Sequence, residues 1–260
     1  MSATTGVTGL LASSGSGNTH DLIDNSGQYT GTLNLASDVY DATQFAASLE
    51  STTHVQGLKA WSMDFAARFQ QKAGLEGSVT FGSGYVVGCR QYSLSIVAPE
   101  FDTTAFGASA WKTWTSGTYS WSGTFEVDID SSTSLSDLTA PGGTGASATF
   151  KFGDETTDDD TAAGNIITTQ LQGSVPVGDL NRATYSFQGS GNLTFAGDNS
   201  LITAGTLGIP AANTATTLTA ASGKTFAGST FWTSIGINCG IGSLIDVTGT
   251  LRGTGALTIG

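Results

Sequence analysis

Apolar and polar side chains alternate strictly along Thr118–Ile129, which has the sequence TYSWSGTFEVDI. The odd positions from Tyr119 onward are apolar or small, and the even positions from Ser120 to Asp128 are polar. A period of two residues is the spacing of a β-strand that buries one face and exposes the other to water. We therefore predict a strand here, with its odd positions in the core and its even positions in solvent.

Related alternation elsewhere in the chain defines four hairpin units. In the first unit, Trp61, Met63 and Phe65 share one predicted face of a strand. The sequence between the units predicts a short helix or turn at 70–77, a connector at 131–147, an acidic loop at 153–164 and a loop or insertion at 204–223. The predicted domains are an N-terminal arm over residues 1–26 and a β domain over residues 27–260, with units at residues 27–69, 88–130, 166–195 and 230–260.

The four units indicate an internal duplication. YDATQF in the first unit matches FDTTAF in the second (residues 40–45 and 101–106), and each is followed at nearly the same distance by a tryptophan, Trp61 or Trp121. The third and fourth units match each other without a gap at an offset of 64 residues. TYSWSGT of the second unit also resembles TYSFQGS of the third, so all four units are interpreted as versions of one hairpin. Such repetition favours a repetitive β architecture.

Composition supports the same fold class. Only 12% of the 260 residues are charged, 36 are glycine, and aromatic and β-branched residues recur with a regular period. This composition is typical of an ordered all-β protein rich in turns. We expect a β-sandwich or partial barrel built from repeated hairpins, with at most one or two short helices.

The net charge of −12 argues against tight binding of nucleic acid. Such binding requires clustered Lys and Arg that neutralise phosphates, and the chain has nine cationic residues against 21 acidic ones. An acidic surface is still useful to a protein that must let DNA pass without holding it.

Motifs for catalysis and for metal binding are absent or weak. His20 and His54 are the only histidines, and no G-x-S-x-G, Walker A or H-E-x-x-H string occurs, so we expect no enzymatic activity and no cofactor. Clustered carboxylates at 154–160 suit Ca²⁺ but lack the D-x-D-x-D-G spacing, which favours a solvated loop. Cys89 and Cys239 have no metal-ligand spacing and are interpreted as free thiols; a disulfide between them is the alternative.

The N-terminal sequence MSATTGVTGLL lacks the basic start and apolar core of a signal peptide. No apolar run approaches the length of a membrane helix. We therefore expect a soluble protein that is made in a cytoplasm and has no membrane partner.

With these residues laid out, the chain resembles the tail tube (major tail) proteins of long-tailed bacteriophages. FDTTAF followed by GTYSWSGTFEVDID is similar to the first β-hairpin and connecting loop of that family, and SVPVGDLNRATYSFQGSGNLT is similar to its final hairpin. The resemblance is clearest across residues 85–195 and from 228 to the end. It implies a virion protein of the phage tail, made in the cytoplasm of a bacterial host, whose partners are further copies of itself and other tail proteins.

The family forms rings, usually hexameric, that stack into a hollow tube through which DNA leaves the capsid. A chain that carries a second copy of each half departs from the simple family pattern. It implies a trimeric ring with pseudo-sixfold symmetry as the alternative to a hexamer.

The polar strand faces are the candidate wall of the channel. Small, weakly acidic side chains avoid phosphate contacts, which would slow the passage of DNA; an ordinary solvent-facing sheet is the alternative reading of the same residues. Only two cations, Arg68 and Arg252, were assigned to these faces. The lumen-wall candidates are Ser120, Ser122, Thr124, Glu126, Asp128, Ser186, Gln188 and Thr250.

Two loops, 41–58 and 102–117, are candidate contacts between rings or subunits. Each begins with an aspartate that starts a turn by accepting hydrogen bonds from backbone N–H groups two residues on. Their aromatic side chains are costly to expose on a single chain, so we expect them to pack against an adjacent ring. The candidate residues are Asp41, Phe45, Asp102, Phe106, Trp111 and Trp114.

Two other functions fit the same composition. A carbohydrate-binding or adhesin β-sandwich would use Trp111, Trp114 and Trp232 as stacking platforms for sugars. A capsid decoration protein is the other alternative.

Overall fold

The computed structural model describes residues 10–15, 18–21, 28–42, 52–73, 78–81, 84–85, 89–107, 110–129, 145–151, 161–175, 181–196, 214–219, 224–241 and 243–260. Every element in these residues is a β-strand, which confirms the predicted all-β class. The described residues contain no helix, and hence none that is long and apolar enough to cross a membrane.

Strands in the described residues range from two to twenty residues in length. In chain order they are β1 (Leu10–Gly15), β2 (Asn18–Asp21), β3 (Gln28–Asp41), β4 (His54–Ala73), β5 (Ser78–Phe81), β6 (Gly84–Tyr85), β7 (Cys89–Val97), β8 (Glu100–Asp102), β9 (Trp114–Ser116), β10 (Ser120–Ile129), β11 (Ala146–Lys151), β12 (Thr161–Ser174), β13 (Asn181–Ala196), β14 (Thr214–Thr219), β15 (Thr225–Gly240) and β16 (Leu244–Ile259).

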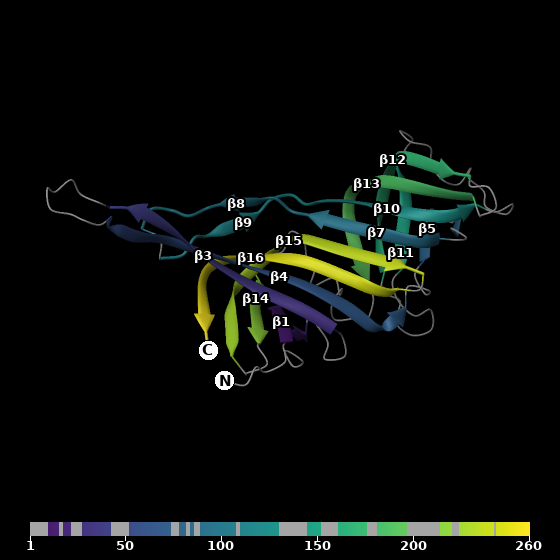
Figure 1. Ribbon diagram of the computed structural model, residues 1–260. Coiled ribbons are helices and arrows are strands. Elements are labelled where there is room, and N and C mark those ends of the chain that lie inside the picture. Colours follow the sequence, from purple (N-terminus) through teal and green to yellow (C-terminus); the bar gives the residue numbers. More distant parts are fainter. Residues whose placement is uncertain are drawn as a thin grey trace.

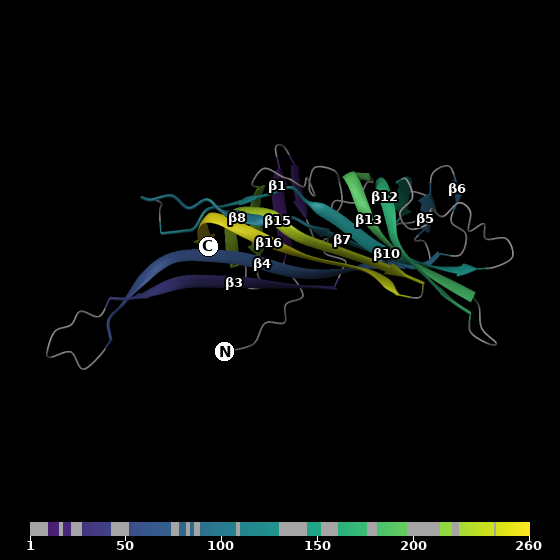
Figure 2. The ribbon, with the colours of Figure 1, turned by 90° about the horizontal axis from the view of Figure 1, so that it is seen from above.

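One antiparallel sheet contains every strand except β8 and β9, which pair with each other. Its main path runs β3-β4-β16-β15-β7-β10-β13-β12-β11-β5-β6, and β14, β1 and β2 branch from the N-terminal half of β15. Figure 1 shows β3 and β12 near opposite ends of this path, with the outer ends of β3 and β4 projecting from the body. Viewed from above, the same hairpin projects beyond the other strands (Figure 2).

The core lies on one face of this sheet and follows the predicted parity. Trp121, Phe125 and Val127 of β10 are buried, whereas Ser120 before them and Thr124 among them are exposed. Aromatic rings stack across neighbouring strands, with the rings of Phe125 and Tyr185 4.7 Å apart. The alternation read from the sequence therefore sets which side chains enter the core.

Two sets of four strands have the same pairings and registers. We call β3, β4, β15 and β16 half 1, and β7, β10, β12 and β13 half 2. In half 2, β7, β10, β12 and β13 correspond to β3, β4, β15 and β16 of half 1. The residue number in half 1 is 61 lower for β7 and 60 lower for β10, and it is 64 higher for β12 and β13. The pair Ser95–Ser122 of half 2 corresponds to Asn34–Ser62 of half 1. In the same way, Ser122–Gln188 corresponds to Ser62–Arg252, and Thr168–Phe187 corresponds to Trp232–Leu251.

Two bulges recur at equivalent positions of the two halves. The bulges of β12 at Ala163/Asn165 and at Thr168/Gln170 recur in β15, 64 residues later. The equivalent bulges of β15 lie at Ala227/Ser229 and Trp232/Ser234. A bulge bends its strand at a fixed place, so the two halves have the same local bends at the same positions.

Each half holds a tryptophan in a socket lined by glycine. Trp121 packs so closely on Gly189 that a Cβ there would lie 2.0 Å from the indole, and its Nε1 donates to the carbonyl of Gly191 at 3.0 Å. Gly191 has a φ of +76°, a left-handed conformation that favours glycine. The half 1 equivalents are Trp61, Gly253 and Gly255, with the same hydrogen bond at 3.0 Å.

Three segments differ from the sequence-based expectation. The N-terminal arm includes strands β1 and β2, because β1 pairs with β14 over Leu10–Thr219 to Ser14–Ala215. β14 itself lies in the stretch predicted as a loop or insertion at 204–223. The residues at 70–73 continue β4, where a helix or turn was expected, and residues 74–77 lie outside the described residues.

Candidate functional surface

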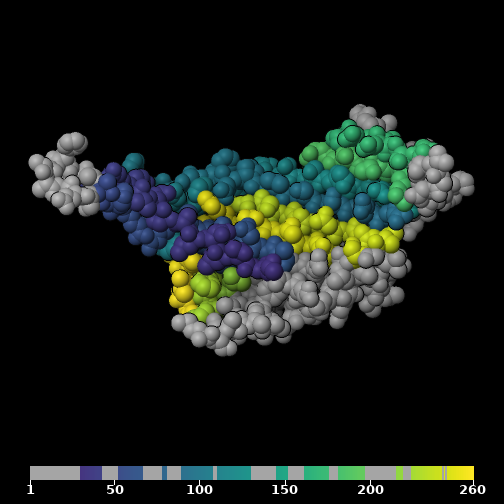
Figure 3. Space-filling view, viewed as in Figure 1, coloured from purple at the N-terminus to yellow at the C-terminus, as the bar shows by residue number. Residues whose placement is uncertain are grey.

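The face of the sheet opposite the core carries small polar side chains across five adjacent strands. We call the outward positions of β16, β15, β7, β10 and β13 the polar face; Figure 3 shows these strands as adjoining bands on one side of the molecule. Two cross-strand rows span it, with nine neutral residues, one aspartate and no cation among ten positions. The rows are Thr248–Gly236–Ser95–Ser122–Gln188 and Asp246–Asn238–Ser93–Thr124–Ser186.

The predicted lumen-wall residues lie on this face or at its margins, and none of them is buried. Thr124 accepts or donates a 2.9 Å hydrogen bond with Ser93 of the neighbouring strand. Thr250 of β16 donates to Asp64 of β4 at 2.8 Å, and Asn34 of β3 donates to the same carboxylate. Residues far apart in sequence are thus joined into one polar surface.

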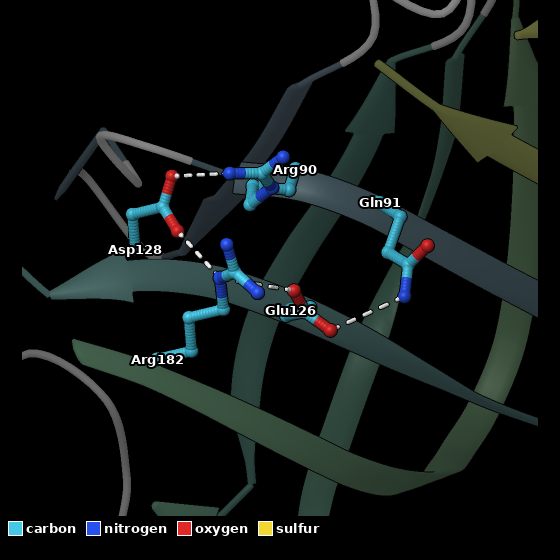
Figure 4. Close-up of polar contacts among 5 residues, drawn as sticks. All are labelled: Arg90, Gln91, Glu126, Asp128 and Arg182. Atoms are coloured by element: carbon cyan, nitrogen blue, oxygen red, sulfur yellow. Dashed lines mark hydrogen bonds and ion pairs between the residues drawn. The ribbon is translucent and has the colours of Figure 1, made fainter. Parts of the chain in front are cut away.

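Two arginines that the sequence analysis did not assign to this surface lie at the end of β10. Arg90 contacts Asp128 at 3.3 Å, and Arg182 contacts Asp128 at 3.4 Å and Glu126 at 3.9 Å. Gln91 donates to the other oxygen of Glu126 at 3.3 Å, as drawn in Figure 4. Each guanidinium on this part of the surface therefore faces a carboxylate, which reduces its attraction for an external anion.

The two cations that the sequence analysis did assign lie on β4 and β16, where Arg68 of β4 is the cross-strand partner of Asp246. Arg252 is half-buried, with its guanidinium 3.9 Å from the ring centroid of Trp114 and 3.3 Å from Glu100. The side chain of Arg68 lies outside the described residues. A parity count alone missed Arg90 and Arg182 because each is near the start of its strand, where the alternation is short.

Two equivalent hairpin arms extend from the sheet. Arm 1 comprises residues 37–42 and 52–59, and arm 2 comprises residues 98–107 and 110–119. Their pairings match at the same residue offsets: Val39–Gln56, Tyr40–Val55 and Asp41–His54 in arm 1, and Glu100–Ser116, Phe101–Thr115 and Asp102–Trp114 in arm 2.

Arm 2 lies on half 1 of its own chain. The backbone of Lys112 donates to the carbonyl of Lys59 at 2.8 Å and accepts from the N–H of Gly255 at 3.0 Å. The N–H of Trp114 donates to the hydroxyl of Thr254 at 2.9 Å. These bonds satisfy backbone groups of the loop that would otherwise face water or the core.

Charged and aromatic side chains reinforce this contact. Lys112 forms a 2.8 Å ion pair with Asp38, and this contact raises the pKa of Lys112. The Lys59 ammonium lies 5.5 Å from the ring centroid of Trp111. Trp111 and Trp114 are half-buried in the single chain, whereas Phe106 is fully exposed; the packing of these loops against an adjacent ring stays a prediction.

Arm 1 contacts arm 2 through Asp38 and Lys59, but within the described residues it makes no contact with half 2 like the one that arm 2 makes with Thr254 and Gly255 of half 1. Figures 1 and 2 show the outer ends of β3 and β4 projecting from the body, and Val39, Tyr40 and Val55 are all exposed. Asp41 lies at the end of β3, and Phe45 lies outside the described residues.

Asp102 starts a turn as predicted. Its carboxylate accepts from the N–H of Thr104 at 2.9 Å, and hydrogen bonds from the Thr104 hydroxyl and N–H lower the pKa of Asp102. The aspartate therefore holds the turn that leads from β8 toward Trp111.

Neither cysteine forms a disulfide, and both lie where β7 meets β15. Burial, followed by the charge of a Cys239 thiolate, raises the pKa of Cys89 to about 12. Burial also raises the pKa of Cys239 and of Tyr92, whose hydroxyl donates to the carbonyl of Lys151 at 2.7 Å. Neither thiol has the depressed pKa of a nucleophilic cysteine.

The described residues contain no group of three or more His, Cys, Asp or Glu side chains arranged to hold a metal ion. The acidic stretch at 154–160 lies outside the described residues. Of the three tryptophans considered as sugar platforms, Trp232 is buried against Phe65, with ring centroids 5.1 Å apart.

Comparison with known proteins returned no matching family model and no matching curated protein.

Proposed function

We propose that this chain is a structural subunit of a phage tail tube, in which copies assemble into stacked rings and the polar face lines the channel. The observation that carries the proposal is the pair of rows across five strands that contain no cation, with Arg90 and Arg182 at their margin paired with carboxylates. The resemblance of the sequence to tail tube proteins supplies the class of assembly.

A channel for DNA must not retain the polymer that passes through it. Each Lys or Arg that contacts a phosphate adds affinity and a salt-dependent barrier to sliding. Ser, Thr, Asn and Gln keep the wall wet, while Asp246 and Glu126 add weak repulsion of phosphates. The composition of the polar face suits this requirement.

The arrangement of edges also supports assembly. Among the described residues, β3 pairs only with β4, and residues 167–174 of β12 pair only with β13. Unpaired strand edges promote association, and ring closure is one way to cover them.

Electron microscopy of the concentrated purified protein tests the proposal. We expect rings or stacked tubes with a central channel, whose mass corresponds to a whole number of chains. Particles that stay single chains at every protein concentration and ionic strength would contradict it.

A charge variant tests the role of the channel wall. The double variant Glu126→Gln, Asp128→Asn removes the carboxylates that pair with Arg90 and Arg182. The rings of this variant should retain short duplex DNA at low salt, with binding that weakens as salt increases, whereas wild-type rings retain none. Glu100→Gln, which alters an ion pair of arm 2 instead, is the matched control.

A further inference from the structure

The seam between the two halves within one chain provides a template for contact between chains. Half 1 and half 2 meet where β15 pairs with β7, from Ser234–Val97 to Gly240–Gln91. The half 2 equivalent of β15 is β12, and the half 1 equivalent of β7 is β3. Both equivalents have free edges among the described residues.

The edges of β12 and β3 that have no partner in the described part of the chain are equivalent to the edges of β15 and β7 that pair in the seam. β15 pairs with β16 on one side, and with β14 and then β7 on the other. β12 pairs with β13 on one side and with β11 on the other, but only as far as Ile166. Among the described residues, 169–175 have no strand partner at the edge where β15 binds β7.

Side-chain exposure points to the same pairing. In the seam within the chain, Ile235 and Ile96 face each other and are 2% and 1% exposed. Their equivalents at the free edges are Leu171 and Leu35, which are 44% and 55% exposed. Val175, the equivalent of buried Cys239, is 79% exposed. At the free edges, large apolar side chains are therefore exposed at positions whose equivalents are buried where β15 pairs with β7.

We propose that β12 of one copy pairs with β3 of the next, in the antiparallel register of the seam within the chain. Subtracting 64 from the number of Ile235 and 61 from that of Ile96 predicts that Leu171 of one copy pairs with Leu35 of the next. The neighbouring pairs are Gln172–Asn34 and Ser174–Thr32. This inference rests on the proposed ring assembly, and its partner is a second copy of this chain.

The arms extend the same repeat. Arm 2 donates the Trp114 N–H to Thr254 and accepts from Gly255 through the Lys112 carbonyl. On half 2 the equivalent acceptor surface is Ser190 and Gly191, which is exposed, and Gly191 keeps the left-handed conformation of Gly255. Arm 1 of a neighbouring copy would place the N–H of His54 and the carbonyl of Thr52 at these two residues.

The contact is heterologous, because one copy contributes its β12 edge and the other its β3 edge. Heterologous contacts close into a ring when the rotation between copies permits. Each chain then supplies two equivalent units, so the seam within the chain and the seam between chains alternate around the ring.

Paired cysteines test the register. In a background with Cys89→Ala and Cys239→Ala, two in-register variants combine Asn34→Cys with Gln172→Cys, and Thr32→Cys with Ser174→Cys. Two shifted variants exchange the partners: Thr32→Cys with Gln172→Cys, and Asn34→Cys with Ser174→Cys. All four use the same exposed positions, so each substitution serves as the folding control for another.

In-register residues of antiparallel strands have Cα atoms roughly 4.5–5.5 Å apart, within the span of a disulfide. A shift of two residues separates them by roughly 8 Å, beyond that span. We expect both in-register variants to form disulfide-linked ladders under mild oxidation, with a yield about tenfold above that of the shifted variants.

Particle mass and electron microscopy of the same samples separate this inference from the proposed function. Rings with in-register cross-links support both. Rings that lack cross-links, or that cross-link mainly in the shifted variants, would contradict the proposed pairing of β12 with β3 without contradicting the tube function. Samples that never form rings overturn the proposed function and the seam with it.

Discussion

Half 1 and half 2 have equivalent strand pairings, the same two bulges in β12 and β15, and the same tryptophan sockets, but their edges and arms have different surroundings. Arm 2 is bonded to half 1 of the same chain, whereas arm 1 projects from the body (Figure 1). The β7 edge is covered by β15, whereas the equivalent β3 edge has no partner among the described residues. Equivalent positions therefore differ in burial because of what lies beside them, and their own sequences do not explain the difference.

The comparison separates two roles of similar residues. Ile96 contributes to the stability of the single chain because it is buried at a covered edge. Its equivalent, Leu35, exposes more than half of its surface and gains burial only on association. Changes in the two halves should consequently separate chain stability from assembly.

The largest effect is expected at the two tryptophan sockets. Trp61→Ala and Trp121→Ala each remove a buried indole and its hydrogen bond, which should reduce the free energy of unfolding by about 3–5 kcal/mol in either half. Chemical denaturation of the purified variants measures the loss. A loss in one half less than half as large as in the other would show that the sockets are not energetically equivalent.

The next effect concerns thiols at the seam. A rise in the pKa of Cys89 from 9.0 to about 12 lowers its thiolate population near pH 8 about a thousandfold. Alkylation of folded protein should be slower by a similar factor than alkylation of unfolded protein. Val175→Cys, at the exposed equivalent of Cys239, should react at an ordinary rate in the single chain. Rapid alkylation of Cys89 in the folded protein would mean that the contact between β7 and β15 opens.

A matched pair of hydroxyl deletions compares the arm contacts. Thr254→Val removes the acceptor of the Trp114 N–H and should cost about 1–3 kcal/mol of stability, because that N–H loses its partner. Ser190→Ala, at the exposed equivalent, should leave unfolding unchanged and weaken ring assembly. Thermal unfolding and particle mass distinguish the two results. Equal destabilisation by both variants would contradict the comparison.

The smallest effect is a pH dependence at Asp102. Since the folded pKa of Asp102 is lowered, its contribution is present above the unfolded pKa near 4 and is lost as the pH falls through the folded value. Fluorescence of tryptophan in arm 2 should change slightly in this acidic range, because the carboxylate is exposed and well screened. Asp102→Asn should remove that component. A wild-type titration identical to that of the variant would assign the change to other carboxylates.

Sequence alternation was sufficient to predict the class of fold and the buried face of β10, because strand parity is a local property. The offsets of 61, 60 and 64 residues, visible in the sequence, are those that relate the strand registers of the two halves. These features depend on neighbours within one strand or on repetition along the chain.

Long-range pairings were not predictable in the same way. Nothing local to β15 indicates that it meets β7, and nothing near Leu10 indicates that β1 pairs with β14. The contacts of Trp114 within its own chain were not predictable, because its partners Arg252 and Thr254 lie about 140 residues later in the chain. Arg90 and Arg182 were missed because each lies near the start of its strand, and their pairing with carboxylates of β10 is visible only in the structure.

The covalent link between the halves has a consequence for how a ring would form. The contact between β15 and β7 is made inside one chain, so only its counterpart between β12 and β3 requires two molecules to meet. A tether converts the first kind of contact into an intramolecular event with a high effective concentration. Every second seam of the ring would then form without loss of translational freedom, and the number of bimolecular steps to closure would be halved.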